Sequence, residues 1–307
     1  EQSGYEILWA NEFDKYANRT YKANFSHRLL TDDIYKLKGK ELENVDVLVG
    51  GFPCQAFSVA GYREGFKDER GNLFFEITRL IEEMKQKPRV LLLENVKNFR
   101  THDEGNTFKT VRAELEKLEY SVLPKVLNTS KYTAIPQNRE RIFIICFRDE
   151  LDWEVMPTSA SRKFDHTFPP EEVDKMDHFR DYLEKEPVDE KYYYRKDKYN
   201  YKELKKDMLS DDRIYQWRRK YVRENKSGVC PTLTANMGTG GHNVPLIKTK
   251  NGIRKLTPRE CFNLQGFPET FVLPEDMPNS QLYKQAGNSV TVALVKKLAE
   301  NIKKAIS

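Results

Sequence analysis

One cysteine, Cys54, stands where the sequence predicts chemistry. It follows the valine-rich run 45–49 and the turn-forming residues Gly51-Phe52-Pro53. The run has the composition of a buried strand, and open α/β sheets present reactive groups at the carboxyl ends of such strands. A thiolate at this place could act as a nucleophile. Free cysteine is nevertheless among the most buried residue types, so a structural role is the alternative when Cys54 is taken alone.

Further blocks of polar residues follow Cys54, and their order argues for the chemical role. The blocks are Glu94-Asn95-Val96, Gln137-Asn138-Arg139-Glu140-Arg141, Arg254–Cys261 with Gln265-Gly266-Phe267-Pro268, and Gln285-Ala286-Gly287-Asn288-Ser289-Val290. Together they resemble the DNA cytosine-C5 methyltransferases, particularly the small bacterial enzymes of restriction–modification systems. The resemblance extends over the whole chain and is weak only over 150–228.

The chemistry of this family explains why these residue types are needed. Atom C5 of cytosine is a poor nucleophile, and a thiolate that adds at C6 converts the ring into an enamine. The resemblance implies that Cys54 is this thiolate, while the Glu94 carboxyl hydrogen-bonds N3 and the 4-amino group of the base. It also implies that Arg141 reaches O2 of the cytosine and that Arg139 helps to organise the site. Surface ion pairing with Glu140 is the alternative for both arginines.

The resemblance also implies S-adenosyl-L-methionine as the cofactor, S-adenosyl-L-homocysteine as the product, and no metal. Glu12 follows a predicted strand at 5–10, and an acidic residue there hydrogen-bonds ribose hydroxyls in dinucleotide-type folds. Phe13 is available to pack against adenine, and Asp33-Ile34 matches the adenine-edge pair of the family, although Asp32 stands where a glycine is usual. Three further residues are expected to line the pocket: Pro53, Asn288 and Ser289.

The family begins with a strand and a Phe-x-Gly-x-Gly-Gly loop that holds the methionine part of the cofactor. No such loop precedes Glu1 in this sequence. We expect the natural chain to begin earlier, with a segment supplied by another polypeptide as the alternative.

Double-stranded DNA is the predicted substrate, and the target base has to leave the duplex before it can meet Cys54. Residues 58–66 resemble the family's mobile loop that closes over the flipped nucleotide, and residues 232–234 match its target-domain stretch near the DNA backbone. The predicted DNA-binding residues are Gln55, Ser58, Arg70, Thr232 and Thr234.

The excess positive charge of the chain lies in one segment. The net charge is +5, and residues 191–226 contain thirteen Lys/Arg against six Asp/Glu, together with seven tyrosines and Trp217. Basic residues interleaved with aromatic ones are typical of a phosphate-contacting surface, and a solvated charged insertion is the alternative. Arg218, Arg219, Lys220 and Arg223 could read bases or hold phosphates, and the sequence does not distinguish these roles.

Alternating patterns indicate the elements that position these residues. Strands are predicted at 45–49, 89–93, 120–127 and 141–147, and helices at 14–23, 73–84, 107–118 and 290–306. This order predicts an α/β fold with a doubly wound, mostly parallel sheet, Rossmann-like as in S-adenosylmethionine-dependent methyltransferases. The strands 120–127 and 141–147 are too close for a helical crossover and could pair antiparallel. We expect a catalytic and cofactor-binding domain at 1–157, a target-recognition domain at 158–272, and a C-terminal segment, 273–307, that returns to the first domain.

Composition is consistent with an intracellular enzyme. The 307 residues include four scattered cysteines without the spacing of a zinc site or a disulfide framework. No membrane span or cleavable signal is apparent, so we expect a cytoplasmic, nucleoid-associated bacterial protein. A cognate restriction endonuclease is the expected functional partner, without a stable complex, and the protein is expected to be a monomer.

Two other functions remain open at this point. A cytosine-C5 methyltransferase acting on RNA would share the Pro-Cys-Gln and Glu-Asn-Val blocks. A non-catalytic DNA-binding relative would explain the absent glycine loop, but the presence of Cys54, Glu94 and Arg141 argues against it.

Overall fold

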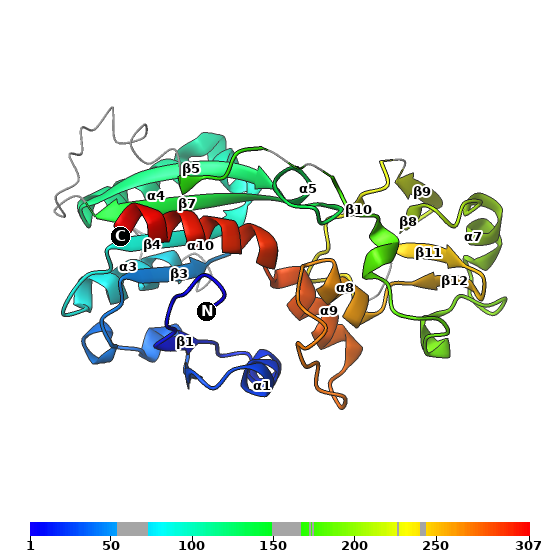
Figure 1. Cartoon of the computed structure of the whole chain (residues 1–307), viewed down its shortest axis with the longest axis horizontal. Coiled ribbons are helices and arrows are strands. Elements are labelled where there is room, and N and C mark those ends of the chain that lie inside the picture. Colours follow the sequence, from blue (N-terminus) through cyan, green and yellow to red (C-terminus); the bar gives the residue numbers. More distant parts are fainter. Residues whose placement is uncertain (54–72, 149–166, 172, 174, 226, 240–243) are drawn as a thin grey trace.

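The computed structural model describes residues 1–307 except 54–72, 149–166, 172, 174, 226 and 240–243. A large lobe around a four-stranded sheet and a smaller lobe around a second sheet lie at opposite ends of the long axis (Figure 1). Two helices, α8 (Pro258–Asn263) and α9 (Asn279–Asn288), lie between them. None of the helices in the described ranges is both long and apolar enough to cross a membrane.

The sheet of the large lobe has the strand order β3-β4-β7-β5. Strands β3 (Val47–Gly51) and β4 (Val90–Val96) pair in parallel, whereas β7 (Glu140–Arg148) runs antiparallel to both β4 and β5 (Tyr120–Asn128). The predicted antiparallel pairing of the last two strands is therefore confirmed. This sheet is mixed rather than mostly parallel, because the connection between β5 and β7 contains only the short helix α5 (Thr129–Tyr132) and β6 (Gln137–Asn138).

Helices cover both faces of this sheet, which explains the continuous apolar run of β4. Leu91 and Leu93 point into a core with α3 (Leu73–Glu83) and α4 (Asn106–Lys117), which contribute side chains such as Phe74 and Val111. Val90 and Leu92 point the other way, against the C-terminal helix α10 (Val292–Ile306). Three buried side chains of α10 make this contact: Leu294, Leu298 and Ile302. Burial of each one contributes about 1.5–3 kcal/mol.

A two-stranded sheet near the N-terminus pairs β1 (Trp9–Asn11) in parallel with β2 (Arg28–Leu30). Helix α1 (Lys15–Asn24) connects them, and the Asp14 carboxylate caps it by accepting hydrogen bonds from two backbone amides. The strand predicted at 5–10 begins four residues too early, because β1 begins only at Trp9. The Tyr5 hydroxyl instead donates to the carbonyl of Ala299 in α10, so this part of the chain lies against that helix.

The smaller lobe contains an antiparallel sheet of order β12-β11-β8-β9. Its strands are β8 (Ile214–Arg218), β9 (Tyr221–Asn225), β11 (Leu246–Thr249) and β12 (Gly252–Lys255), with α7 (Tyr201–Asp207) beside them. Sequence patterns did not predict α7, β8 or β9. Tyr215 and Trp217 are buried in the core of this lobe with Leu204 and Met208, so these aromatic residues of the basic segment serve packing.

A short parallel pair joins the two lobes. Strand β10 (Cys230–Pro231) pairs with β6 of the large lobe, and Cys230 lies opposite Gln137. Around it, α8 and α9 share a core with the segment that follows β10, and Tyr283 of α9 and Leu233 both belong to this core. This junction brings the polar blocks of the sequence together.

Candidate active site

Glu94 and Arg141 form an ion pair at the end of the central sheet. Glu94 lies near the end of β4, opposite Gly51 of β3, and Arg141 lies near the start of β7, opposite Val96. The antiparallel pairing of β4 with β7 thus brings two residues far apart in the sequence to the same edge. Arg141 Nε lies 2.9 Å from Glu94 Oε1, and both side chains are largely buried.

Burial dominates the electrostatics of this pair. It raises the pKa of the Glu94 carboxyl above its ordinary value, although the charges of Arg141 and Arg139 oppose the shift. Burial likewise lowers the pKa of the Arg141 guanidinium, against the attraction of Glu94. A carboxyl group with a raised pKa holds a proton more readily than an ordinary glutamic acid does.

The backbone that leads to Cys54 is fixed beside Glu94. The Asn95 side-chain amide donates to the Phe52 carbonyl at 2.8 Å and is buried. The Phe52 ring packs against Phe74 and Phe99, with centroid distances of 5.3 and 5.4 Å. A Cβ atom on Gly51 would lie 3.5 Å from Glu94 Oε2. The chain therefore passes next to Glu94 just before Cys54.

Four predicted residues lie outside the described residues: Cys54, Gln55, Ser58 and Arg70. The predicted mobile loop at 58–66 lies outside them as well. Their roles stay predictions. Sequence reasoning did not single out Asn95, although it belongs to the Glu-Asn-Val block and ties β4 to the segment before the cysteine.

Arg139 lies in the junction between the lobes. Its guanidinium donates to the carbonyl oxygens of Leu233, Gly287 and Ser289, at 2.8, 3.0 and 2.5 Å. The side chain is only 2% exposed, and burial together with the nearby Arg141 charge lowers its pKa to about 9. Arg139 thus joins three segments through their backbone. Its guanidinium is directed at these backbone carbonyl oxygens.

In the Gln-Ala-Gly-Asn-Ser-Val block, close backbone packing requires a glycine at position 287. A Cβ atom on Gly287 would lie only 2.2 Å from the backbone carbon of Thr234. No side chain fits there, so α9 and the segment of Thr234 approach each other directly. The glycine therefore allows α9 to pack closely against the segment of Thr234 in the junction.

Two buried glutamines complete the junction, and sequence reasoning missed their role. Gln137 Nε2 donates to the Leu264 carbonyl at 2.8 Å and to Gln265 Oε1 at 3.1 Å. Gln265 Nε2 in turn donates to the Ala286 carbonyl at 2.7 Å. Both glutamines are fully buried. The available signal was their presence inside two of the polar blocks.

The predicted cofactor residues lie at the ends of three strands and of one helix. Glu12 follows β1 and accepts a hydrogen bond from the Asp14 amide, while Phe13 is 68% exposed. Asp33 follows β2 and caps the turn at Ile34–Lys36. Because β1 and β2 are parallel, these residues share the carboxyl edge of that sheet. The remaining predicted residues are Pro53 after β3, and Asn288 and Ser289 at the end of α9.

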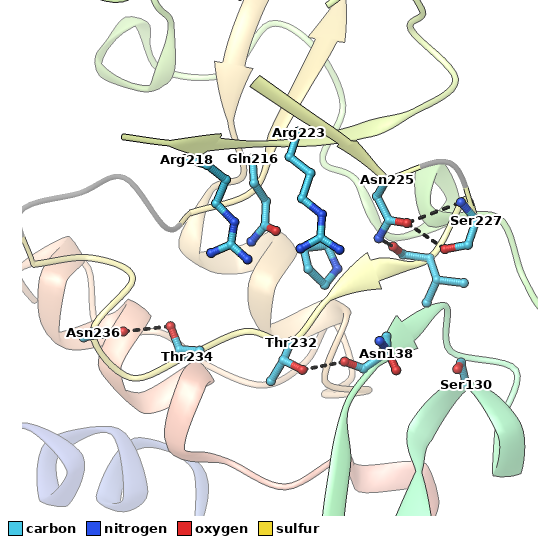
Figure 2. Close-up of a pocket in the computed structure, with 12 residues that line it drawn as sticks. Ser130, Asn138, Gln216, Arg218, Arg223, Asn225, Ser227, Thr232, Thr234 and Asn236 are labelled. Atoms are coloured by element: carbon cyan, nitrogen blue, oxygen red, sulfur yellow. Dashed lines mark hydrogen bonds between the residues drawn. The ribbon is translucent and has the colours of Figure 1, made fainter. Parts of the chain in front are cut away.

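Thr232 and Thr234 line a cleft between the junction and the smaller lobe (Figure 2). The Thr232 hydroxyl donates to the Asn138 carbonyl at 2.5 Å, and the Thr234 hydroxyl donates to Asn236 Oδ1 at 2.8 Å. The structure thus brings these two residues together at one wall. Among the described residues, no cluster of three or more His, Cys, Asp or Glu could hold a metal ion.

The sequence is similar to known methyltransferases over its whole length. The family model "C-5 cytosine-specific DNA methylase" matches residues 1–304. The type II methyltransferase M.Bsp6I of Bacillus sp. (strain RFL6) is 53% identical, and the match covers 100% of this chain and 94% of the relative. Type II methyltransferase M.HhaI of Haemophilus parahaemolyticus is 36% identical, with coverages of 98% and 89%.

Two solved structures share the fold. The methyltransferase Dnmt2 of S. pombe superimposes with a TM-score of 0.69 at 18% identity, covering 98% of this chain and 92% of that one. A putative DNA modification methyltransferase encoded within a prophage of E. coli gives a TM-score of 0.69 at 22% identity, covering 99% and 93%. At these identities the likeness concerns the fold alone. The family match and the identity to type II methyltransferases place the chain in the C-5 cytosine-specific DNA methylase family, and the protein is a DNA (cytosine-5-)-methyltransferase.

Proposed function

We propose that the protein methylates a flipped-out cytosine in duplex DNA through a covalent adduct of Cys54. The Cys54 thiolate adds to C6 of the base, and the developing charge at N3 is met by the Glu94 carboxyl. C5 then takes the methyl group, which would leave S-adenosyl-L-homocysteine as the product. Loss of the C5 proton to water and return of the N3 proton to Glu94 accompany the β-elimination that expels the Cys54 thiolate. The ion pair of Glu94 with Arg141 beside the backbone that leads to Cys54 carries this proposal.

Glu94 and Arg141 have complementary tasks in this scheme. Because burial raises the pKa of Glu94, its carboxyl can present a proton to N3 and accept a hydrogen bond from the 4-amino group. Arg141 keeps the carboxyl in place at 2.9 Å and offers its remaining donors to O2 of the base. Arg139 acts indirectly: it stabilises the junction through its hydrogen bonds to backbone carbonyl oxygens and does not contact the base.

The residues at the carboxyl edge of β1 and β2 fit S-adenosyl-L-methionine. When bound, this cofactor supplies an electrophilic methyl group on a sulfonium sulfur. The Glu12 and Asp33 carboxylates lie on one edge and suit hydroxyl and amino donors, and the exposed Phe13 ring suits an adenine face. Ile34, Pro53, Asn288 and Ser289 would complete the pocket. The donor set requires no metal.

The similarity to type II methyltransferases supports the wider role proposed here. The protein would act as a monomer in the bacterial cytoplasm, associated with the nucleoid, and protect DNA from a cognate restriction endonuclease without a stable complex. We assign 1–157 to catalysis and cofactor binding, 158–272 to target recognition, and 273–307 to a segment returning to the large lobe. Packing of α10 against β4 supports the last assignment.

A trapping experiment tests the mechanism. Duplex DNA containing 5-fluorocytosine is incubated with the protein and S-adenosyl-L-methionine, and the products are separated on a denaturing gel. Fluorine at C5 cannot leave as a proton does, so we expect a cofactor-dependent covalent band. The Cys54→Ala variant should give no band and no methyl transfer, while still binding duplex DNA. Turnover by that variant would refute Cys54 as the nucleophile.

A further inference from the structure

The cleft beside the β8–β9 hairpin has a volume of about 760 Å³ and two different walls. Thr232, Thr234 and Asn236 belong to the junction side, and Gln216, Arg218 and Arg223 to the hairpin side. Figure 2 shows the three hairpin side chains extending toward the threonines. The cleft therefore lies between the proposed catalytic lobe and the one region with excess positive charge.

Strand alternation explains why these side chains face the cleft. Tyr215 and Trp217 of β8 point into the core of the smaller lobe, so the residues between and after them, Gln216 and Arg218, point the opposite way. Gln216 lies directly opposite Arg223 of β9. Cross-strand partners lie side by side on one face, so an amide and a guanidinium fork lie next to each other at the cleft.

The hairpin groups have unused hydrogen-bonding capacity. Gln216 is only 9% exposed, yet its amide makes no hydrogen bond with any described residue. No carboxylate in the described part of the chain lies within ion-pair distance of Arg218 or Arg223. By contrast, Arg213 of the same region pairs with Glu224 at 3.7 Å. Because Gln216 lines the cleft, the donor and the acceptor of its amide are available to a ligand that binds there.

We propose that Gln216, Arg218 and Arg223 read base edges in the major groove of the target DNA, with Arg223 bound to a guanine. This inference rests on the proposed function. A two-stranded ribbon fits the major groove, and an arginine fork matches O6 and N7 of guanine. Gln216, with both a donor and an acceptor, contacts the neighbouring base.

Phosphate binding explains this arrangement less well. A phosphate offers acceptors only, so it would leave the Gln216 carbonyl unused. The exposed cation Lys220 at the hairpin turn suits a phosphate better, since its flexible point charge needs no matching edge. The hairpin therefore separates a base-reading face from a turn that contributes charge.

Methylation of a randomised duplex library, read by bisulfite sequencing, tests the assignment. For Arg223→Lys and Arg223→Ala we expect relaxed preference at one guanine position and a loss of about 5- to 150-fold on the preferred sequence. Gln216→Leu should relax an adjacent position. Lys220→Ala is the matched control: it removes a charge from the same hairpin and should weaken all sequences alike, with a shallower salt dependence.

Replacing the guanines of the preferred sequence one at a time with 7-deazaguanine gives a second measurement. This base lacks the N7 acceptor. Replacement at one guanine position should therefore lower methylation by the wild type and leave methylation by Arg223→Ala unchanged. Unchanged sequence preference in Arg223→Lys, Arg223→Ala and Gln216→Leu, all folded by thermal melting, would overturn the inference. Failure of the wild type to methylate any duplex in the library would instead overturn the proposed function.

Discussion

Among the described residues, polar side chains are paired internally at the sheet edge and in the junction, but not on the cleft face of the β8–β9 hairpin. At the edge of the central sheet and in the junction, the polar side chains are paired with each other or with backbone. Glu94 holds Arg141, and Arg139 donates to three carbonyl oxygens. On the cleft face of the β8–β9 hairpin, the side chains of Gln216 and Arg223 make no hydrogen bond or ion pair with another described residue.

This difference separates groups that must be preorganised from groups that bind. A catalytic carboxyl works only if its position and its pKa are set before the substrate arrives, and internal partners set both. A recognition face keeps its donors available, so its pairing is completed by the ligand. Substitutions should therefore affect rate or stability in the first region and sequence preference in the second.

Glu94→Gln should have the largest effect on the paired region. The amide keeps the shape of the carboxyl but cannot transfer a proton to N3, so we expect kcat to fall by about 10²–10⁴-fold. Single-turnover methylation measures the chemical step, and equilibrium binding of S-adenosyl-L-methionine serves as the control. A selective loss of cofactor affinity with an unchanged chemical step would contradict the assigned role.

The raised pKa of Glu94 gives a pH signature. In the native state the carboxyl binds its proton more tightly than in the unfolded chain, so its contribution to stability is present at low pH and falls as the pH rises through the raised pKa. The same titration should produce a descending limb in the pH profile of the chemical step. Glu94→Gln should lack both features, whereas a limb that persists in this variant must belong to another group.

Arg139→Met should lower stability more than any surface change. It leaves three carbonyl oxygens, two of them buried, without their charged donor, and each buried acceptor left unsatisfied costs about 1–3 kcal/mol. Urea unfolding gives the free energy of unfolding. Arg112→Ala is the control, because its ion pair with Glu116 is half exposed and should cost less than about 1 kcal/mol. Equal effects would contradict a structural role for Arg139.

Gly287→Ala tests the packing side of the junction. The added methyl group would overlap the Thr234 backbone, so we expect a loss of about 1–3 kcal/mol in the free energy of unfolding. Gly50→Ala is the matched control, since its Cβ would meet side-chain atoms only at 3.6 Å. A Gly287→Ala protein as stable as Gly50→Ala would show that α9 can move away from Thr234.

Sequence reasoning worked where local pattern and global fold agree. The apolar runs of β4 and β7 and the face of α10 are long and periodic, and the structure confirms these elements. Glu94 and Arg141 were assigned from two short blocks, and the register of β4 with β7 places them in contact. Arg139 carried no signal of its buried position, because its partners are carbonyl oxygens from distant segments.

The strands of the smaller lobe were not predictable from the sequence. Its strands β8 and β9 are short, and their polar alternation resembles a solvated insertion when the second sheet face is unknown. Tyr215 and Trp217 belong to the aromatic residues that the sequence analysis assigned to a phosphate-contacting surface, but they are core residues. Which cations face the cleft depends on strand register, and composition does not contain that information.

Arg223→Ala should have the smallest effect on stability, and it therefore tests most directly whether the hairpin face lacks internal partners. The side chain is exposed and has no ion pair within the described residues, so the free energy of unfolding should change by less than about 0.5 kcal/mol. Urea unfolding beside Arg139→Met provides the scale. A loss of several kcal/mol in Arg223→Ala would mean that the hairpin face has an internal partner, and the contrast between paired and open regions would fail.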